Sequence, residues 1–304
     1  MILIKARRGR GAYSGGQTEE IVMSLRDILF HIDTYPEPTS SEAIQQAVQF
    51  AASMGGTVSA LAIEVMIEAP RNRLADYVIG LSQLARTEER KSRDFCVAAL
   101  ADFTGKATAA GVLGEAIHGK SDLYSVGAAV ARRARTRDLC LVPVVDENDG
   151  QRSVIEAVVF GSGRPVLTYR PGTADLRAAG AGEVVLAWDG TKTAARAMAD
   201  ALPLMEKARK VRVLTVTGDK TSTGSGLGEE AQRHLIAHGV NAVLDEVDSG
   251  GRPIGLVFED YLQRQKPDLF VMGAYGHSRA REFILGGATD HMLKNPGVPL
   301  MLSH

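Results

Sequence analysis

Short apolar runs alternate with amphipathic segments along the chain, and the same order of elements occurs twice. The runs 27–33 and 58–63 enclose a segment whose apolar residues recur every three or four positions: Ile44, Ala47, Val48 and Ala51. The runs 183–189 and 211–216 enclose a segment with the same spacing: Ala194, Met198, Ala201 and Met205. This spacing predicts a helix, and a short apolar run is typical of a buried strand.

The rest of each copy continues the pattern. Apolar runs at 138–143 and 163–169 in the first copy match 268–273 and 297–303 in the second. Strands that alternate with helices, and that are apolar on both faces, indicate parallel sheets covered by helices. The sequence therefore predicts an α/β fold of two tandem, Rossmann-like domains, each with a doubly wound, five-stranded parallel sheet.

Domain boundaries follow from the repeat. We predict an N-terminal domain at 23–170 and a C-terminal domain at 183–304. The segment 171–182 between them is rich in small residues and in Gly and Pro, which predicts a linker. Residues 1–22 contain three arginines but no following apolar core of the signal-peptide type, and we predict a disordered leader.

Composition narrows the function classes. Of 304 residues, 45% are hydrophobic and 23% are charged, which is ordinary globular usage. A net charge of -1 argues against a dedicated nucleic-acid binder. No stretch approaches the roughly 20 apolar residues of a membrane-spanning helix. Cys96 and Cys140 lack metal-ligand spacing, and two free thiols are typical of the reducing cytoplasm, where we place the protein.

A glycine-punctuated loop follows the apolar run 268–273. Gly273 and Gly276 are separated by two residues, and nine residues separate Gly276 from Gly286. Glycine lacks a Cβ, so its backbone can approach an anion closely and point N–H groups at it. The helix expected to begin at Gly286 and Gly287 adds unpaired N–H groups and a positive dipole end, which favour phosphate.

This glycine spacing resembles that of the universal stress protein family. Its nucleotide-binding members carry Gly, two residues, Gly, nine residues, Gly, then Ser or Thr. The three glycines of that pattern fall at Gly273, Gly276 and Gly286, but Gly287 stands where the Ser or Thr is expected. The backbone N–H is kept there and the hydroxyl is lost, with Thr289 nearby.

The resemblance implies a site in the C-terminal domain for ATP or a related adenine nucleotide, with magnesium bridging the phosphates. The resemblance assigns Ala187 and Asp189, at the end of one strand, to this site. Asp189 would contact the base or ribose, and Val216 would offer its backbone to adenine. The ribose and phosphates would be held by residues of the glycine motif and the following helix: Gly273, Gly276, Gly286, Gly287, Ala288 and Thr289. The resemblance further implies a sensor or switch in the stress response.

The first copy lacks these glycines. Pro143 stands at the position equivalent to Gly273, and Asp146 at that of Gly276. Proline has no N–H to donate, and a carboxylate repels phosphate. We therefore predict that the N-terminal domain does not bind nucleotide in the family's manner.

Residues 114–121 match a different phosphate motif, the P-loop pattern of Gly, four residues, then Gly119, Lys120 and Ser121. A P-loop needs a strand before the first glycine and a helix directly after the serine. Because 114–118 is itself strand-like and matches 243–248 of the second copy, we predict a strand there. Lys120 and Ser121 are expected to form a turn before a helix at 123–135.

Three classes of function remain open: a nucleotide-binding sensor, a nucleotide-free interaction protein of the same fold, and an enzyme, either a slow ATPase or a P-loop NTPase. We identify no general base aimed at an attacking water and assign no catalytic residue or metal ligand. Domains of the family pair through their last strands. The resemblance therefore implies an internal pseudo-dimer in this chain, paired through 164–169 and 298–303, and leaves a homodimer and any protein partner open.

Overall fold

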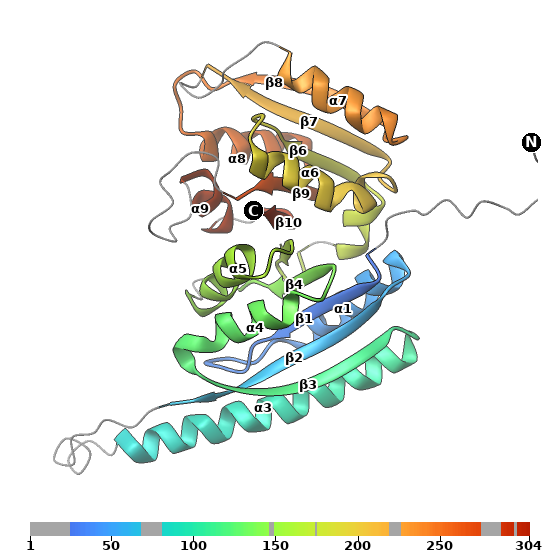
Figure 1. Ribbon diagram of the computed structural model, residues 1–304. Coiled ribbons are helices and arrows are strands. Elements are labelled where there is room, and N and C mark those ends of the chain that lie inside the picture. The colour runs from blue at the N-terminus through green and yellow to red at the C-terminus, as the bar shows by residue number, and fades with distance from the viewer. Residues whose placement is uncertain are drawn as a thin grey trace, which may run out of the picture.

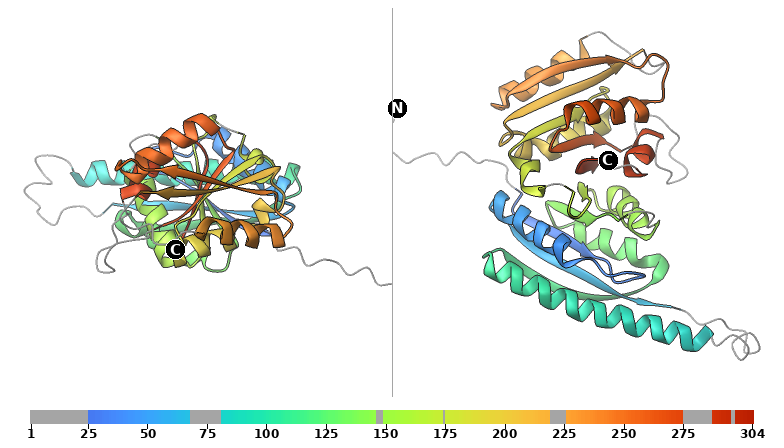
Figure 2. Two further views of the ribbon diagram at one scale, coloured as in Figure 1. Left: turned by 90° about the horizontal axis from the view of Figure 1, so that it is seen from above. Right: turned by 180° about the vertical axis from the view of Figure 1, so that it is seen from behind.

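The computed structural model describes residues 25–67, 81–145, 149–173, 175–218, 226–274, 287–294 and 297–304. These residues form one ten-stranded sheet with helices on both faces (Figures 1 and 2). The strand order is β3-β2-β1-β4-β5-β10-β9-β6-β7-β8, so each half of the chain contributes five adjacent strands. The predicted fold class, two doubly wound halves of five parallel strands, is confirmed.

The first half alternates strands with helices, apart from a single-turn helix, η1. Its strands are β1 (Asp27–Ile32), β2 (Thr57–Met66), β3 (Leu113–Asp122), β4 (Leu139–Pro143) and β5 (Val166–Tyr169). Its helices are α1 (Ser41–Met54), α3 (Leu81–Ala109), η1 (Leu123–Ser125), α4 (Val126–Ala134) and α5 (Asp149–Gly161).

The second half repeats the order after a short connecting helix, η2 (Leu176–Gly180). Its strands are β6 (Glu183–Ala187), β7 (Lys210–Thr217), β8 (Ala242–Asp248), β9 (Leu269–Gly273) and β10 (Leu300–Ser303). Its helices are α6 (Lys192–Met205), α7 (Leu227–Ala237), α8 (Ile254–Gln265) and α9 (Gly287–Lys294).

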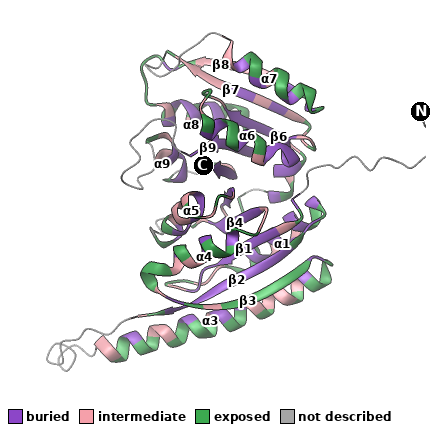
Figure 3. Cartoon of the chain, in the orientation of Figure 1, coloured by how far each residue is buried: buried purple, intermediate pink, exposed green. Residues whose placement is uncertain are grey.

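Alternating side chains of the strands fill two cores, one on each face of the sheet. Ile28 and Phe30 of β1 point to the side covered by α1, α3, α6 and α7, whereas Leu29 points to the side of α4, α5, α8 and α9. Each core runs through both halves of the chain. Figure 3 shows the central strands buried and the outer faces of the helices exposed.

Helix ends follow local sequence signals. The Ser40 side chain caps α1 by accepting from the backbone N–H of Ala43 at 3.2 Å. Gly55 ends the same helix with φ of 71°, a left-handed conformation that strains other residues. Thr191 caps α6 in the same way as Ser40 caps α1. These caps place the equivalent helices α1 and α6 directly after the first strand of each half.

The segment that matches the P-loop pattern is part of a strand. Residues 114–121 lie inside β3, which pairs in parallel with β2 over the registers Ile63 to Gly119 and Glu64 to Lys120. The Lys120 ammonium lies 3.1 Å from the Glu64 carboxylate. The predicted turn at Lys120 and Ser121 is therefore wrong, because pairing with β2 extends the strand to Asp122. The same pairing rules out a phosphate loop in this segment.

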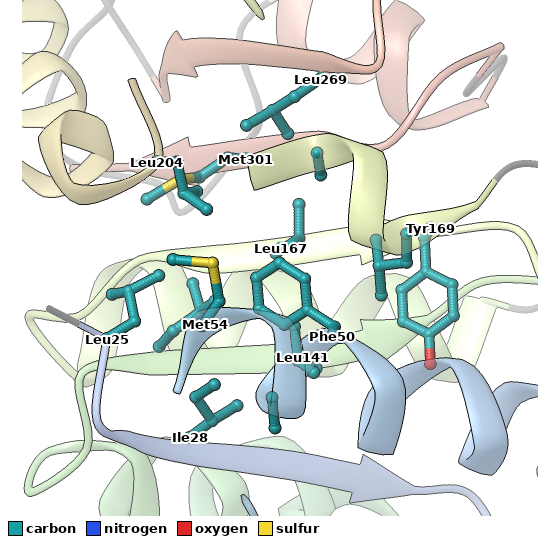
Figure 4. Packing of buried hydrophobic residues seen from close by; sticks show 14 of the residues in the cluster. Leu25, Ile28, Phe50, Met54, Leu141, Leu167, Tyr169, Leu204, Leu269 and Met301 are labelled. Atoms are coloured by element: carbon teal, nitrogen blue, oxygen red, sulfur yellow. The ribbon is translucent and has the colours of Figure 1, made fainter. Parts of the chain in front are cut away.

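The two halves join edge to edge through their last strands. β5 and β10 pair antiparallel, with Leu167 opposite Met301. Figure 4 shows both side chains inside the core that spans the junction. On the other face, the Arg152 guanidinium of α5 lies 2.5 Å from the Asp290 carboxylate of α9.

The segment predicted as a linker is a packed element between the halves. Leu176 and Ala179 of η2 are buried. A Cβ at Gly180 would lie 2.9 Å from the Met54 sulfur and 3.3 Å from a Leu204 methyl group, so this glycine fits between a side chain of each half. Figure 4 shows Met54 and Leu204. Within the described part of the chain, no helix combines the length and the apolar character needed to cross a membrane.

Truncation of Leu167 tests the junction. Leu167 is fully buried, and we expect Leu167→Ala to lower the free energy of unfolding by about 2–5 kcal/mol, because a cavity opens in a core shared by both halves. Chemical denaturation measures the change. Ile236→Ala, at a side chain 53% exposed on α7, is the control and should stay within about 0.5 kcal/mol of wild type. Equal effects of the two variants would contradict a structural role for the junction.

Candidate functional site

The carboxyl ends of β6 and β9 meet where the second half changes the face on which its helices pack. The helix after β6, α6, lies on one face of the sheet, and α9, the helix after β9, lies on the other. β6 and β9 are paired neighbours. In open parallel sheets the crevice outside the carboxyl ends at such a switch point is the usual place for a ligand. Figure 1 labels these two strands, whose last residues are Ala187 and Gly273.

Asp189 lies just beyond β6 and is exposed. Its Oδ1 accepts hydrogen bonds from the Thr191 backbone N–H at 3.0 Å and from the Thr191 hydroxyl at 2.7 Å. The same hydroxyl oxygen accepts from the Ala194 N–H at the start of α6. Ala187, by contrast, is 8% exposed, so its methyl group belongs to the core. The strand end therefore presents a solvent-facing carboxylate held by a tight turn.

Trp188 and Leu227 are in contact beside Asp189, and the sequence did not predict this contact. The Trp188 indole N–H donates to the backbone carbonyl of Leu227 at 2.9 Å. A Cβ at Gly190 would lie 3.2 Å from a Leu227 methyl group, so the first residue of α7 packs on the turn after β6. The two residues are far apart in sequence. Only the uniqueness of Trp188, the single tryptophan, could have drawn attention to it.

Val216 lies one residue before the end of β7, opposite Val247 of β8. Its side chain is half-buried and packs against the core on the α8 and α9 face. The structure therefore places Val216 within the strand ladder, one strand away from Ala187.

Gly273 ends β9 at a point of close backbone contact. A Cβ there would lie 2.6 Å from the backbone carbonyl carbon of Thr193 and 2.7 Å from the nitrogen of Ala194. The start of α6 thus packs directly against this glycine. A glycine is needed at this position because any side chain would collide with the backbone of α6. The sequence motif did not predict this packing role.

α9 joins the carboxyl end of β9 to the start of its parallel neighbour β10, so α9 begins at the same edge of the sheet as Asp189. A Cβ at Gly287, its first residue, would meet nothing within 4 Å among the described residues. Ala288 is half-buried against the core, and Thr289 is 2% exposed. Thr289 therefore packs inward and is poorly placed to replace the hydroxyl missing at Gly287.

α9 is fixed from both sides. His291 Nε2 lies 2.7 Å from the Glu259 carboxylate of α8. Asp290 pairs with Arg152 at 2.5 Å and with Lys294 at 2.9 Å. Burial alone would raise the pKa of Asp290, but its hydrogen bonds and ion pairs with Lys294 and Arg152 outweigh burial and hold that pKa below its usual value. The carboxylate in the first turn of α9 is thus paired with cations.

Two predicted site residues, Gly276 and Gly286, lie outside the described residues. The remaining ones fall into two groups. Asp189, Gly273 and Gly287 lie at or just beyond element ends on the carboxyl edge of the second half, whereas Ala187, Val216, Ala288 and Thr289 contribute side chains that are buried or half-buried.

The first half differs at the equivalent strand end. Pro143 ends β4 and pairs with Tyr169, just as Gly273 ends β9 and pairs with Ser303. The strand ends are therefore structurally equivalent, and the first half has a residue without an N–H at that point. Asp146 lies outside the described residues.

Other candidate chemistry is limited in the described part of the chain. No group of three or more His, Cys, Asp or Glu side chains is arranged there to hold a metal ion. Both cysteines are buried, and burial raises the pKa of the Cys96 thiol to about 11 and that of Cys140 to about 12. These thiols stay protonated at neutral pH and are poor nucleophiles.

Comparison with known proteins supports the fold. No protein-family model and no curated protein sequence matches the chain. A universal stress protein from Archaeoglobus fulgidus superposes with a TM-score of 0.65 over 90% of this chain and 95% of that one, at 15% sequence identity. A putative universal stress protein from Pseudomonas aeruginosa superposes with a TM-score of 0.53 over 92% and 93% of the two chains, also at 15% identity.

A functionally unknown protein from Pseudomonas aeruginosa is similar to the same extent, with a TM-score of 0.53, 14% identity and 92% of each chain covered. At these identities the likeness concerns the fold. The chain has the fold of universal stress proteins over about 90% of its length, and the resemblance predicted from the glycine motif is confirmed at that level.

Alanine substitutions at Gly273 and Gly287 test whether a Cβ is excluded at the first position and accommodated at the second. We expect Gly273→Ala to lower the free energy of unfolding by about 1–3 kcal/mol, because its Cβ would collide with backbone atoms of α6 that cannot move independently. Gly287→Ala is the matched control and should leave stability unchanged or slightly higher, since its Cβ meets open space. Urea denaturation of both variants measures the difference. A neutral Gly273→Ala would contradict the close contact with α6.

Proposed function

We propose that the C-terminal half binds ATP or a related adenine nucleotide at the carboxyl ends of β6 and β9. The observation that carries the proposal is the arrangement of this switch point, where an exposed Asp189 lies on the same edge of the sheet as the start of α9 at Gly287, a residue whose Cβ would meet nothing within 4 Å among the described residues. Adenine, ribose and phosphates together need a hydrogen-bond acceptor for hydroxyls and a row of N–H donors for anionic oxygens.

Each part of that edge suits one part of a nucleotide. The Asp189 carboxylate would accept hydrogen bonds from the ribose or base, and the β7 end near Val216 would line the adenine. The first N–H groups of α9 lack partners within the helix and would bind phosphate, supported by the helix dipole. No side chain at Gly287 blocks this approach. Magnesium would bridge the phosphate oxygens, which supply its preferred oxygen ligands.

We assign one site per chain because the equivalent acid of the first half is buried as well as hydrogen-bonded. Asp33 matches Asp189 in the repeat but is only 8% exposed. Its carboxylate lies 2.9 Å from His31 Nε2 and accepts from Gln151 Nε2 at 2.7 Å. Pro143 removes a backbone donor from the neighbouring strand end. A nucleotide in the first half would lose both its acceptor and part of its phosphate contacts.

We propose binding with little or no hydrolysis, since no residue of the site is assigned as a general base. A protein that binds a nucleotide without consuming it is suited to act as a switch, and universal stress proteins of the same fold support a role in the stress response. Two buried free thiols support the cytoplasm as its location.

Calorimetric titration with Mg-ATP tests the site. We expect one nucleotide per chain for wild type. Gly287→Asp should abolish binding, because its carboxylate would face the phosphates, while the free energy of unfolding stays equal or rises, since an acid in the first turn suits the helix dipole. Gly297→Asp is the matched control. It adds the same charge at another glycine whose Cβ would meet nothing within 4 Å, and it should bind as wild type does.

Two results would contradict the proposal. Equal binding by wild type and Gly287→Asp would place the nucleotide elsewhere. Absence of heat and of thermal stabilisation at millimolar Mg-ATP would favour the alternative, a nucleotide-free interaction protein of this fold.

A further inference from the structure

Two histidines lie next to each other at the end of α7. His234 belongs to the last turn of this helix, and His238 is its C-cap residue. Both residues are exposed. Side chains four positions apart lie on the same face of a helix, and the centres of these two rings are 4.8 Å apart. The end of α7 therefore presents a pair of neighbouring imidazoles on the surface.

The ring nitrogens of this pair are available to a ligand. In the described part of the chain, no protein group forms a hydrogen bond or ion pair with a ring nitrogen of His234 or His238. The other described histidines each have a ring nitrogen next to a carboxylate or carbonyl oxygen: His31, His118, His291 and His304. A ligand at the pair would therefore displace no protein contact of these nitrogens.

The spacing of the two rings suits a shared metal ion. Zinc–nitrogen bonds of about 2.0–2.1 Å place the centre of an imidazole roughly 3.2 Å from the ion. Two rings that bind one ion at an angle of roughly 90–110° then have centres roughly 4.5–5.2 Å apart. The observed 4.8 Å lies within this range. Because both side chains are exposed, rotation about their Cβ–Cγ bonds can turn a nitrogen of each ring toward one ion and leaves the ring centres nearly in place.

The electrostatics of α7 favour a cation at this end. The last carbonyl groups of a helix give its C-terminal end a partial negative charge. Glu230, also exposed, lies four residues before His234 and adds a negative charge on the same side of the helix. Arg233 is the neighbouring cation, and its Nε donates to the Glu229 carbonyl at 3.3 Å, toward the start of the helix.

The ligand atoms define the class of ion. Imidazole nitrogen suits Zn²⁺, Ni²⁺ and Cu²⁺, whereas Mg²⁺ and Ca²⁺ prefer oxygen ligands. Among the described residues, no third His, Cys, Asp or Glu side chain completes a metal-binding group with the pair. Water would therefore fill the remaining coordination positions, so the bound ion would stay exposed and exchangeable.

We propose that His234 and His238 together bind one divalent transition-metal ion of the class that imidazole prefers. The ion would link the last turn of α7 to its C-cap residue and so hold the end of this helix in place. The site is separate from the proposed nucleotide site, because the residue of α7 that packs beside Asp189 is Leu227, at the other end of the helix.

Titration with zinc chloride tests the proposal on full-length protein without an affinity tag and without nucleotide. Calorimetry should show one Zn²⁺ per chain. In nitrogen-15 NMR of histidine-labelled protein, Zn²⁺ should shift the signals of His234 and His238 together and leave the remaining histidine signals in place. Ni²⁺ should compete with Zn²⁺, whereas Mg²⁺ and Ca²⁺ should shift neither signal.

Variants of the pair test whether both rings bind the ion. His234→Gln and His238→Gln should each weaken zinc binding at least about tenfold, because loss of even an outer partner of a metal ligand typically costs 10–100-fold. All variants change exposed positions and should unfold at nearly the same urea concentration as wild type in the absence of zinc.

The matched control is the double variant Ile236→His with His238→Gln. It keeps two histidines at the end of α7 but places them two residues apart, where they do not face each other. Ile236 is 53% exposed, so the change leaves the core intact. This variant should bind zinc as weakly as His238→Gln does.

The proposal fails on any of three results. The first is zinc binding by wild type that is no tighter than binding by the two single variants. The second is wild-type affinity in the double variant, which would show that the spacing is irrelevant. The third is a zinc response at other histidines that leaves the signals of His234 and His238 unchanged.

Discussion

The antiparallel pairing of β5 with β10 is the constraint on which the rest of the molecule depends. Within each half all strands run parallel, so every carboxyl end lies at one edge. Because the two halves meet antiparallel, their carboxyl edges point in opposite directions across one continuous sheet. The two switch points therefore lie at opposite edges and share no residue, while the cores beneath them are common to both halves. The core is therefore shared by the two halves, whereas the edges at which their strands end are separate.

This separation lets two copies of one plan diverge. Asp33 and Asp189 follow equivalent strands. In the first half the acid is buried beneath His31 and Gln151, and in the second it faces solvent on the turn into α6. The neighbouring strand ends also differ. Pro143, which has no backbone N–H, ends β4 in the first half, and Gly273 ends β9 in the second. Asp33 therefore lines a small pocket, whereas Asp189 lies on an exposed turn.

Much of the fold could be predicted from the sequence because its signals are local. Apolar runs and spacings of three and four residues define the strands and the helices α1 and α6, and the repeat defines the order of elements. The predicted turn at Lys120 and Ser121 was wrong, because pairing with β2, a contact distant in sequence, makes these residues continue a strand.

The sites were less predictable, since they depend on contacts between distant residues. The motif did not show that Thr289 packs inward or that Gly273 accommodates α6. The network of Asp33 with Gln151 joins positions 118 residues apart, and no spacing rule connects them.

The central proposal is that only the second half binds a nucleotide, although the two halves are alike in fold. Hydrogen-exchange mass spectrometry with and without Mg-ATP tests it most directly, because peptides from both halves are read in one experiment. The account predicts slower exchange at the end of β6 and the start of α9, with no change at 31–39. Protection at 31–39 by nucleotide, or equal protection of both halves, would contradict it.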